Sequence, residues 1–215
     1  MSVQRIAIFL VMAIVLSLIG RPSSTMAAAI DLALIDFEYD SSAWTLGWKF
    51  SVTAPASLEA LGVYDSSQDG LAGPAQIGLW LASGGSPLVQ TTIAAGTDAA
   101  LDGYFRFAPV PSTVLTPGIE YVIGSHLDGD LATSLFGGNG LVDPRVTVID
   151  VRYSSVGSGF GFPGQTDPGT DGAAFLGGNF QLTPVPLPTA AWLFGSGLVS
   201  LGSLVRRWRG KGHSV

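Results

Sequence analysis

The side chains best suited to binding an ion lie in residues 63–71, VYDSSQDGL. Asp65, Ser67 and Asp69 alternate before a glycine, as the oxygen ligands do in the first half of an EF-hand calcium loop. The twelfth position of such a loop is Gln76, which cannot supply the required bidentate carboxylate. A true EF-hand is therefore excluded. Two interpretations remain: a Ca²⁺ site that combines these oxygens with others, and a solvated turn, which is preferred.

A second acidic segment, residues 126–130 (HLDGD), could complete such a site. Asp128 and Asp130 would add ligands if their loop lies at the same end of the domain as Asp65. The alternative is again an Asp-Gly turn, and it is preferred. Ca²⁺ is the one cofactor that the sequence suggests.

Residues for catalysis are few. His126 has no partner histidine before the C-terminal tail, and no serine shows a nucleophile-elbow pattern. Glu59 and Glu120 could form the carboxylate pair of a glycoside-active enzyme, but both fall in expected strands, where a solvated outer face is the ordinary position. We expect no enzymatic activity, with a secreted glycoside-active enzyme as the third alternative.

Aromatic side chains offer a different chemistry, stacking on sugars. Most of them alternate onto the expected core side of strands. Trp80 is the exception, because Leu79 and Leu81 fit the inner face and turn Trp80 outward. Trp80 is therefore the predicted glycan contact.

Charge restricts the partners of the central domain. Residues 30–189 hold four basic residues against all sixteen acidic ones, a net charge of −12. A domain this acidic repels phosphate backbones, so nucleic acid is not an expected partner. The chain has no cysteine, which removes thiol catalysis and disulfides.

The candidate binding and catalytic residues must be positioned by secondary structure, and the sequence predicts strands. From Trp44 to Val52, bulky apolar residues alternate with small or polar ones, a period of two that indicates a half-buried strand. Further strands are expected at residues 58–64, 76–81, 88–93, 104–108, 120–125, 146–153 and 174–182. A hairpin turn is expected at 83–87 and a type II turn at 116–118. The fold class predicted for residues 30–183 is all-β, an antiparallel β-sandwich or jelly roll.

The N-terminal residues 1–29 are typical of a secretory signal peptide. Arg5 precedes an apolar run at residues 6–19, and Ala27 and Ala29 suit positions −3 and −1 of a cleavage site after Ala29. The alternative is an uncleaved membrane anchor.

The C-terminal residues 184–215 combine three features in order. A proline motif comes first, then an apolar run at 190–205 that would form a helix of roughly 24 Å, and then a basic cluster. The motif consists of Val185, Pro186, Leu187 and Pro188; the cluster consists of Arg206, Arg207, Arg209 and Lys211. A marginal membrane span with its basic end in the cytoplasm is expected, which leaves residues 30–189 outside the inner membrane.

This three-part order resembles the PEP-CTERM class of bacterial sorting tails, in its variant that opens with Val-Pro-Leu-Pro-Ala. Thr189 stands where that variant has alanine. The resemblance implies processing by an exosortase, a membrane-embedded enzyme of Gram-negative bacteria whose substrates are exported and linked to extracellular polysaccharide or biofilm. An ordinary C-terminal anchor is the alternative.

Residues 47–52, 61–65, 69–71 and 76–80 also resemble a bacterial extracellular sandwich family of unknown function that is often attached to this tail. The expectation is an exported structural or adhesive protein of the cell envelope or extracellular matrix. Its expected partners are an exosortase, the inner membrane during sorting, and extracellular polysaccharide. The alternative is a glycan- or calcium-binding module without catalysis.

Overall fold

The computed structural model describes residues 26–136, 138–155, 157 and 159–185. The chain divides into two compact units, Met1–Pro184 and Val185–Val215, and all described strands belong to the first. Residues 1–25, three residues of the expected sorting motif (Pro186, Leu187 and Pro188), the apolar run and the basic cluster lie outside the described residues. Within the described part, no helix is long and apolar enough to cross a membrane.

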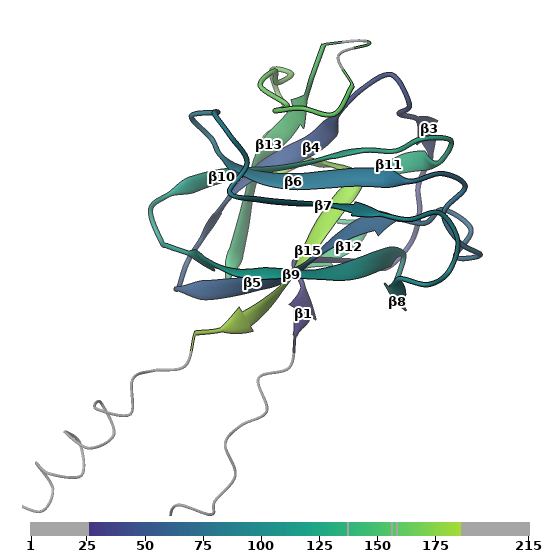
Figure 1. The fold of residues 1–215 in the computed structure, drawn as a ribbon. Coiled ribbons are helices and arrows are strands. Elements are labelled where there is room, and N and C mark those ends of the chain that lie inside the picture. Colours follow the sequence, from purple (N-terminus) through teal and green to yellow (C-terminus); the bar gives the residue numbers. More distant parts are fainter. Residues whose placement is uncertain (1–25, 137, 156, 158, 186–215) are drawn as a thin grey trace, which may run out of the picture. The chain divides into compact units, whose positions relative to one another are not determined.

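Two five-stranded sheets make up the body of this unit (Figure 1). The first has the order β1 (Ala27–Ala28), β15 (Gly178–Pro184), β5 (Ala56–Tyr64), β9 (Phe105–Leu115) and β8 (Ala100–Asp102). The second has the order β13 (Val146–Tyr153), β4 (Leu46–Val52), β10 (Glu120–His126), β6 (Ala75–Leu81) and β7 (Val89–Ile93).

Two smaller sheets lie beside them. They contain β14 (Ala174–Leu176), β11 (Leu131–Leu135) and β3 (Tyr39–Asp40), and β12 (Gly140–Val142) with β2 (Ile30–Leu32). Every pairing among the named strands is antiparallel, and the described residues form no helix. The fold is therefore all-β and sandwich-like, as expected.

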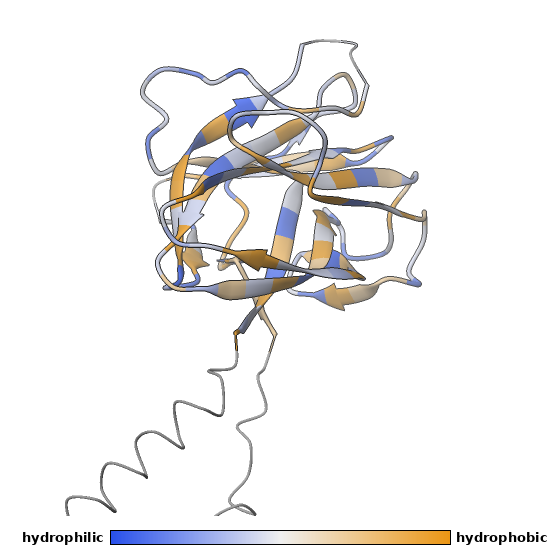
Figure 2. Cartoon of the chain, turned by 60° about the vertical axis from the view of Figure 1, so that its left-hand side comes forward, coloured by the Kyte–Doolittle hydropathy of each residue, from blue (hydrophilic) through white to orange (hydrophobic). Residues whose placement is uncertain are grey.

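The core lies between the two large sheets. Trp48 and Phe50 of β4 face Phe180 of β15, with ring centroids 5.5 and 4.7 Å from that of Phe180. The indole Nε1 of Trp48 donates a hydrogen bond of 3.0 Å to the carbonyl oxygen of Gly178, so the buried polar atom is satisfied. Hydrophobic and hydrophilic segments alternate along the strands, as Figure 2 shows, because successive side chains point to opposite faces.

The predicted strands are confirmed with ends shifted by one or two residues, except that the strand expected at 104–108 continues to Leu115 as β9. Residues 174–182 divide into β14 and β15. β6 and β7 form the expected hairpin. Gly118 has a φ of 81° and the amide of Ile119 donates to the carbonyl oxygen of Thr116, which fits the predicted type II turn. That turn connects strands of different sheets, β9 and β10.

The chain enters and leaves this unit on neighbouring strands. Ala27 and Ala28 of β1 pair with Leu182 and Gln181 of β15. Ala29 is fully buried, and its amide donates to the carbonyl oxygen of Phe180 at 2.8 Å. Cleavage after Ala29, as predicted from the sequence, would therefore remove β1 from the folded unit. The sequence could not reveal β1, because a two-residue strand shows no alternation.

Candidate functional site

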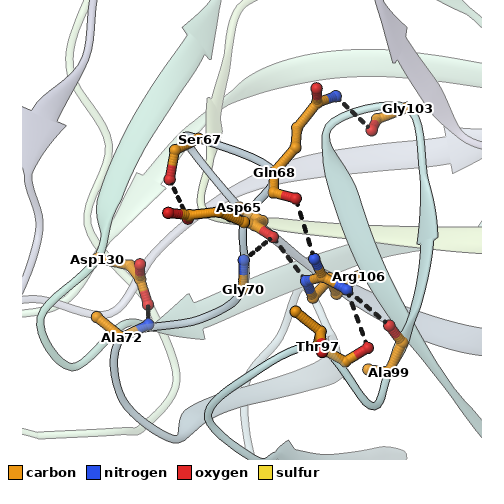
Figure 3. Close-up of polar contacts among 11 residues, drawn as sticks. Asp65, Ser67, Gln68, Gly70, Ala72, Thr97, Ala99, Gly103, Arg106 and Asp130 are labelled. Atoms are coloured by element: carbon orange, nitrogen blue, oxygen red, sulfur yellow. Dashed lines mark hydrogen bonds and ion pairs between the residues drawn. The ribbon is translucent and has the colours of Figure 1, made fainter.

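The turn after β5 is organised around a buried ion pair. The Oδ2 atom of Asp65 accepts hydrogen bonds from Nε of Arg106 at 2.6 Å and from the amide of Gly70 at 3.0 Å (Figure 3). The side chains of Arg106 and Asp65 are only 5% and 1% exposed. Asp65 thus has an internal cation as its partner.

Arg106 also fixes the backbone around it. Its guanidinium donates to the carbonyl oxygens of Thr97, Ala99 and Gln68 at 3.1–3.2 Å. Gln68 has a φ of 60°, and its side-chain amide donates to the carbonyl oxygen of Gly103. Arg106 therefore ties the turn to the β7–β8 connection. The sequence held one signal for this role: a lone arginine between Phe105 and Phe107, in a domain with only four basic residues.

The two predicted acidic segments do meet. The Oδ2 atom of Asp130 accepts the amide of Ala72 at 2.9 Å, and Ser67 donates to Asp69. Burial raises the pKa of Asp130, and the charges of Asp65 and Asp69 raise it further. The carboxylates are therefore close enough to interact electrostatically.

A metal centre does not follow from this proximity. The side chain of Asp128 is exposed, and the Oδ1 atom of Asp65 is buried without a hydrogen-bond partner. Among the described residues, no group of three or more His, Cys, Asp or Glu side chains is placed to hold a metal ion. The Ca²⁺ site therefore stays a prediction, and the geometry shows a turn held by Arg106.

Trp80 does point away from the core, but it is not available to a glycan. Phe160 and Phe162 pack on it, with ring centroids 5.5 and 6.1 Å from the indole, and its exposed fraction is 2%. The expectation of an exposed Trp80 is wrong, because the segment after β13 folds back over this face of the sheet. Strand alternation gives the direction of a side chain and not what covers it.

The two candidate catalytic glutamates lie on different sheets. Glu59 on β5 accepts a hydrogen bond from Ser112 at 3.0 Å, whereas Glu120 on β10 pairs with Lys49 at 3.3 Å. His126 contacts the carbonyl oxygen of Trp44 through Nδ1 at 2.8 Å. Within the described part of the chain, these three side chains make no hydrogen bond or ion pair with one another.

Sequence reasoning missed an aromatic hollow with a volume of about 330 Å³, lined by Trp44, Tyr153, Asp167 and Phe175. The rings of Trp44 and Tyr153 meet edge to face, with centroids 5.8 Å apart and planes at 72°. The hydroxyl of Tyr153 donates to Oδ1 of Asp167 at 3.1 Å, and this bond is the main reason that the pKa of Tyr153 is raised.

The walls of the hollow are held by the backbone. The amide of Trp44 donates to the carbonyl oxygen of Ser41 at 2.9 Å, while its own carbonyl contacts His126. Tyr153 and Gln165 exchange two backbone hydrogen bonds of 3.0 and 2.9 Å. Phe175 lies on β14 opposite Ser134. The backbone of all three aromatic residues is therefore held by contacts within the fold.

A protein-family model described as a domain of unknown function, DUF4082, matches residues 34–170. That range includes Trp44, Tyr153 and Asp167 of the hollow, and both acidic segments. No curated protein matches the chain.

Proposed function

We propose that this chain, which belongs to the DUF4082 family, is an exported structural or adhesive protein. It is delivered to the cell envelope or extracellular matrix of a Gram-negative bacterium by exosortase-type sorting.

The observation that carries this proposal is the sequence of three features in the C-terminal segment. A Val-Pro-Leu-Pro motif, an apolar run and a basic cluster follow one another over residues 185–211. The two prolines, Pro186 and Pro188, disfavour helix and full strand pairing, so the segment before the apolar run is suited to lie extended in a processing enzyme. The N-terminal residues supply the complementary export signal.

The domain is compatible with export, because it does not need disulfides to form a core. It is all-β, contains no cysteine and buries its core without disulfides. Its acidic surplus favours solubility outside the cell. A glycan-binding module is the second candidate function, and the aromatic hollow favours it.

Intact-mass measurement of the protein released from its native host tests the sorting proposal. The expected mature form lacks residues 192–215, because cleavage near the proline motif discards the apolar run. The double variant Pro186→Ala, Pro188→Ala is expected to accumulate at full C-terminal length in the membrane. Pro117→Ala, a proline exchange in the exposed β9–β10 turn, is the matched control and should be processed normally.

A mature native form that retains residues 192–215 would contradict the proposal and indicate an ordinary anchor. If the double variant is processed at the rate of the Pro117→Ala control, the proline motif is not required for sorting.

A further inference from the structure

We propose that the hollow between Trp44, Tyr153 and Phe175 binds a saccharide chain that carries free amino groups, with Asp167 as the group that recognises them. This inference deepens the proposed function, on which it rests for the source of the ligand in the surrounding matrix.

The first support is the chemistry of the walls. Pyranose rings present faces of C–H groups, which pack on aromatic rings and lose little hydration in doing so. Trp44, Tyr153 and Phe175 are each partly exposed at the hollow and not buried in the sandwich core. Its volume of about 330 Å³ falls at the lower end of the range for ligand sites, roughly 300–1,000 Å³.

The second support is the carboxylate. Asp167 is exposed, and Tyr153 donates to its Oδ1 atom, which orients the group beside the ring. Its Oδ2 atom makes no hydrogen bond to another described residue and can accept one from a ligand. A protonated amine is the stronger donor for this position, because charge-assisted hydrogen bonds exceed neutral ones.

The third support is the net charge of the folded domain. All four basic side chains in the described part of the chain are paired with carboxylates, which leaves the acidic surplus unbalanced. The basic residues are Lys49, Arg106, Arg145 and Arg152. A polymer of uronic acids or sulfated sugars would therefore be repelled, whereas an amino-bearing saccharide is attracted.

The fourth support is rigidity. Besides the anchored aromatic residues, the hydroxyl of Thr170 donates to the carbonyl oxygen of Asp167 at 2.7 Å, and the amide of Gly172 donates to Ile149 of β13 at 2.8 Å. The segment that carries Asp167 is thus tied at its base. A site formed in advance loses less conformational entropy on binding.

The experiment is titration calorimetry at pH 6 with the full chain in nanodiscs of neutral lipid. The probes are oligomers of glucosamine, of N-acetylglucosamine and of galacturonate, with choline as a small cation. Glucosamine oligomers are expected to bind about tenfold or more tightly than the N-acetylated ones, and galacturonate oligomers not at all.

Two variants separate the contributions. Asp167→Asn should remove the preference for glucosamine, while Asp171→Asn, an exposed carboxylate on the same connection, is the matched control and should leave it unchanged. Phe175→Leu keeps an apolar side chain but removes a ring, and it should weaken binding of both amino sugar oligomers. Thermal unfolding of each variant shows whether the fold is intact.

Absence of saccharide binding would overturn the proposal. An equal loss of the preference for glucosamine in Asp167→Asn and Asp171→Asn would overturn it as well. If choline competes with the oligomers at similar affinity, the hollow is a site for alkylammonium ions and not for saccharides. These results do not depend on the C-terminal cut, so a failure here with normal processing would leave the sorting proposal standing, and the reverse also holds.

Discussion

Asp65 shows that the same spacing of polar residues is compatible with two structures, a cation-binding loop and a turn held by an internal ion pair. The spacing of Asp65, Ser67 and Asp69 is that of a cation loop, yet the charge next to Asp65 is the guanidinium of Arg106, at a distance of 2.6 Å. Arg106 follows Asp65 by 41 residues, so no local pattern could join them. The turn itself was predicted from its Asp and Gly residues.

The buried pair gives the first stability prediction. Asp65→Asn keeps the shape of the side chain but leaves Arg106 without its counter-charge, and we expect a loss of about 3–5 kcal/mol in the free energy of unfolding. Urea unfolding measures it. Glu120→Gln is the control, because the Glu120 side chain is about half exposed and Lys49 keeps its ion pair with Asp150, so the exchange should cost less than about 1 kcal/mol. An equal effect of both exchanges would contradict the assigned role of Arg106.

A second prediction concerns alkaline pH. Burial raises the pKa of Tyr39 to about 12, and burial with the nearby Glu38 raises that of Tyr64. The unfolded chain releases these protons near pH 10. Stability is therefore fully present below about pH 10 and falls as the pH rises toward 12. Urea midpoints at pH 9 and pH 11 should show the drop, and Tyr39→Phe should reduce it. A midpoint that is unchanged between the two pH values would refute this origin.

The aromatic hollow marks the limit of residue-level prediction. Trp44 was assigned to the core by the alternation that it shares with Trp48. The structure places it two residues before β4, beside Tyr153 and Phe175. Trp44 precedes Tyr153 and Phe175 by more than a hundred positions. A period of two carries no information about which strand ends converge.

At the scale of elements, alternation found the long strands because each has one face in the core. It missed β1, β2, β3, β8, β11 and β12, which are two to five residues long. Strands this short show too few alternations to stand out from loops. Sheet order was equally inaccessible: β4 lies between β13 and β10, which are distant in sequence.

The short strand β1 gives the prediction at this scale. A chain that begins at Ile30 lacks the β1–β15 pairing, the hydrogen bond from Ala29 to Phe180 and the one from Asp143 to Ala29. We expect it to lose at least about 2 kcal/mol relative to a chain that begins at Met26. Thermal unfolding of the two forms, each released from the same fusion by a specific protease, measures the difference.

A chain that begins at Ala27 serves as the control and should match the longer form closely. N-terminal sequencing of exported native material should accordingly show a start at Ala27 or earlier. Equal melting temperatures, together with a native start at Ile30, would contradict this prediction and support the boundary after Ala29.

At the scale of the whole folded unit, its two termini and the segment that carries Asp167 lie at different ends. β1 begins and β15 ends side by side, whereas the segment that follows β13 and carries Asp167 lies at the opposite end (Figures 1 and 2). The sequence predicted the sandwich and its acidic surplus, but the separation of these two ends depends on strand order and became visible only in the fold.

The pairing of β1 with β15 has a consequence for how such a sandwich can be reused. Because its first and last strands are hydrogen-bonded neighbours, a short peptide would suffice to join them. The same sandwich can therefore be inserted into a loop of a larger protein as readily as it can be joined to a segment at one terminus.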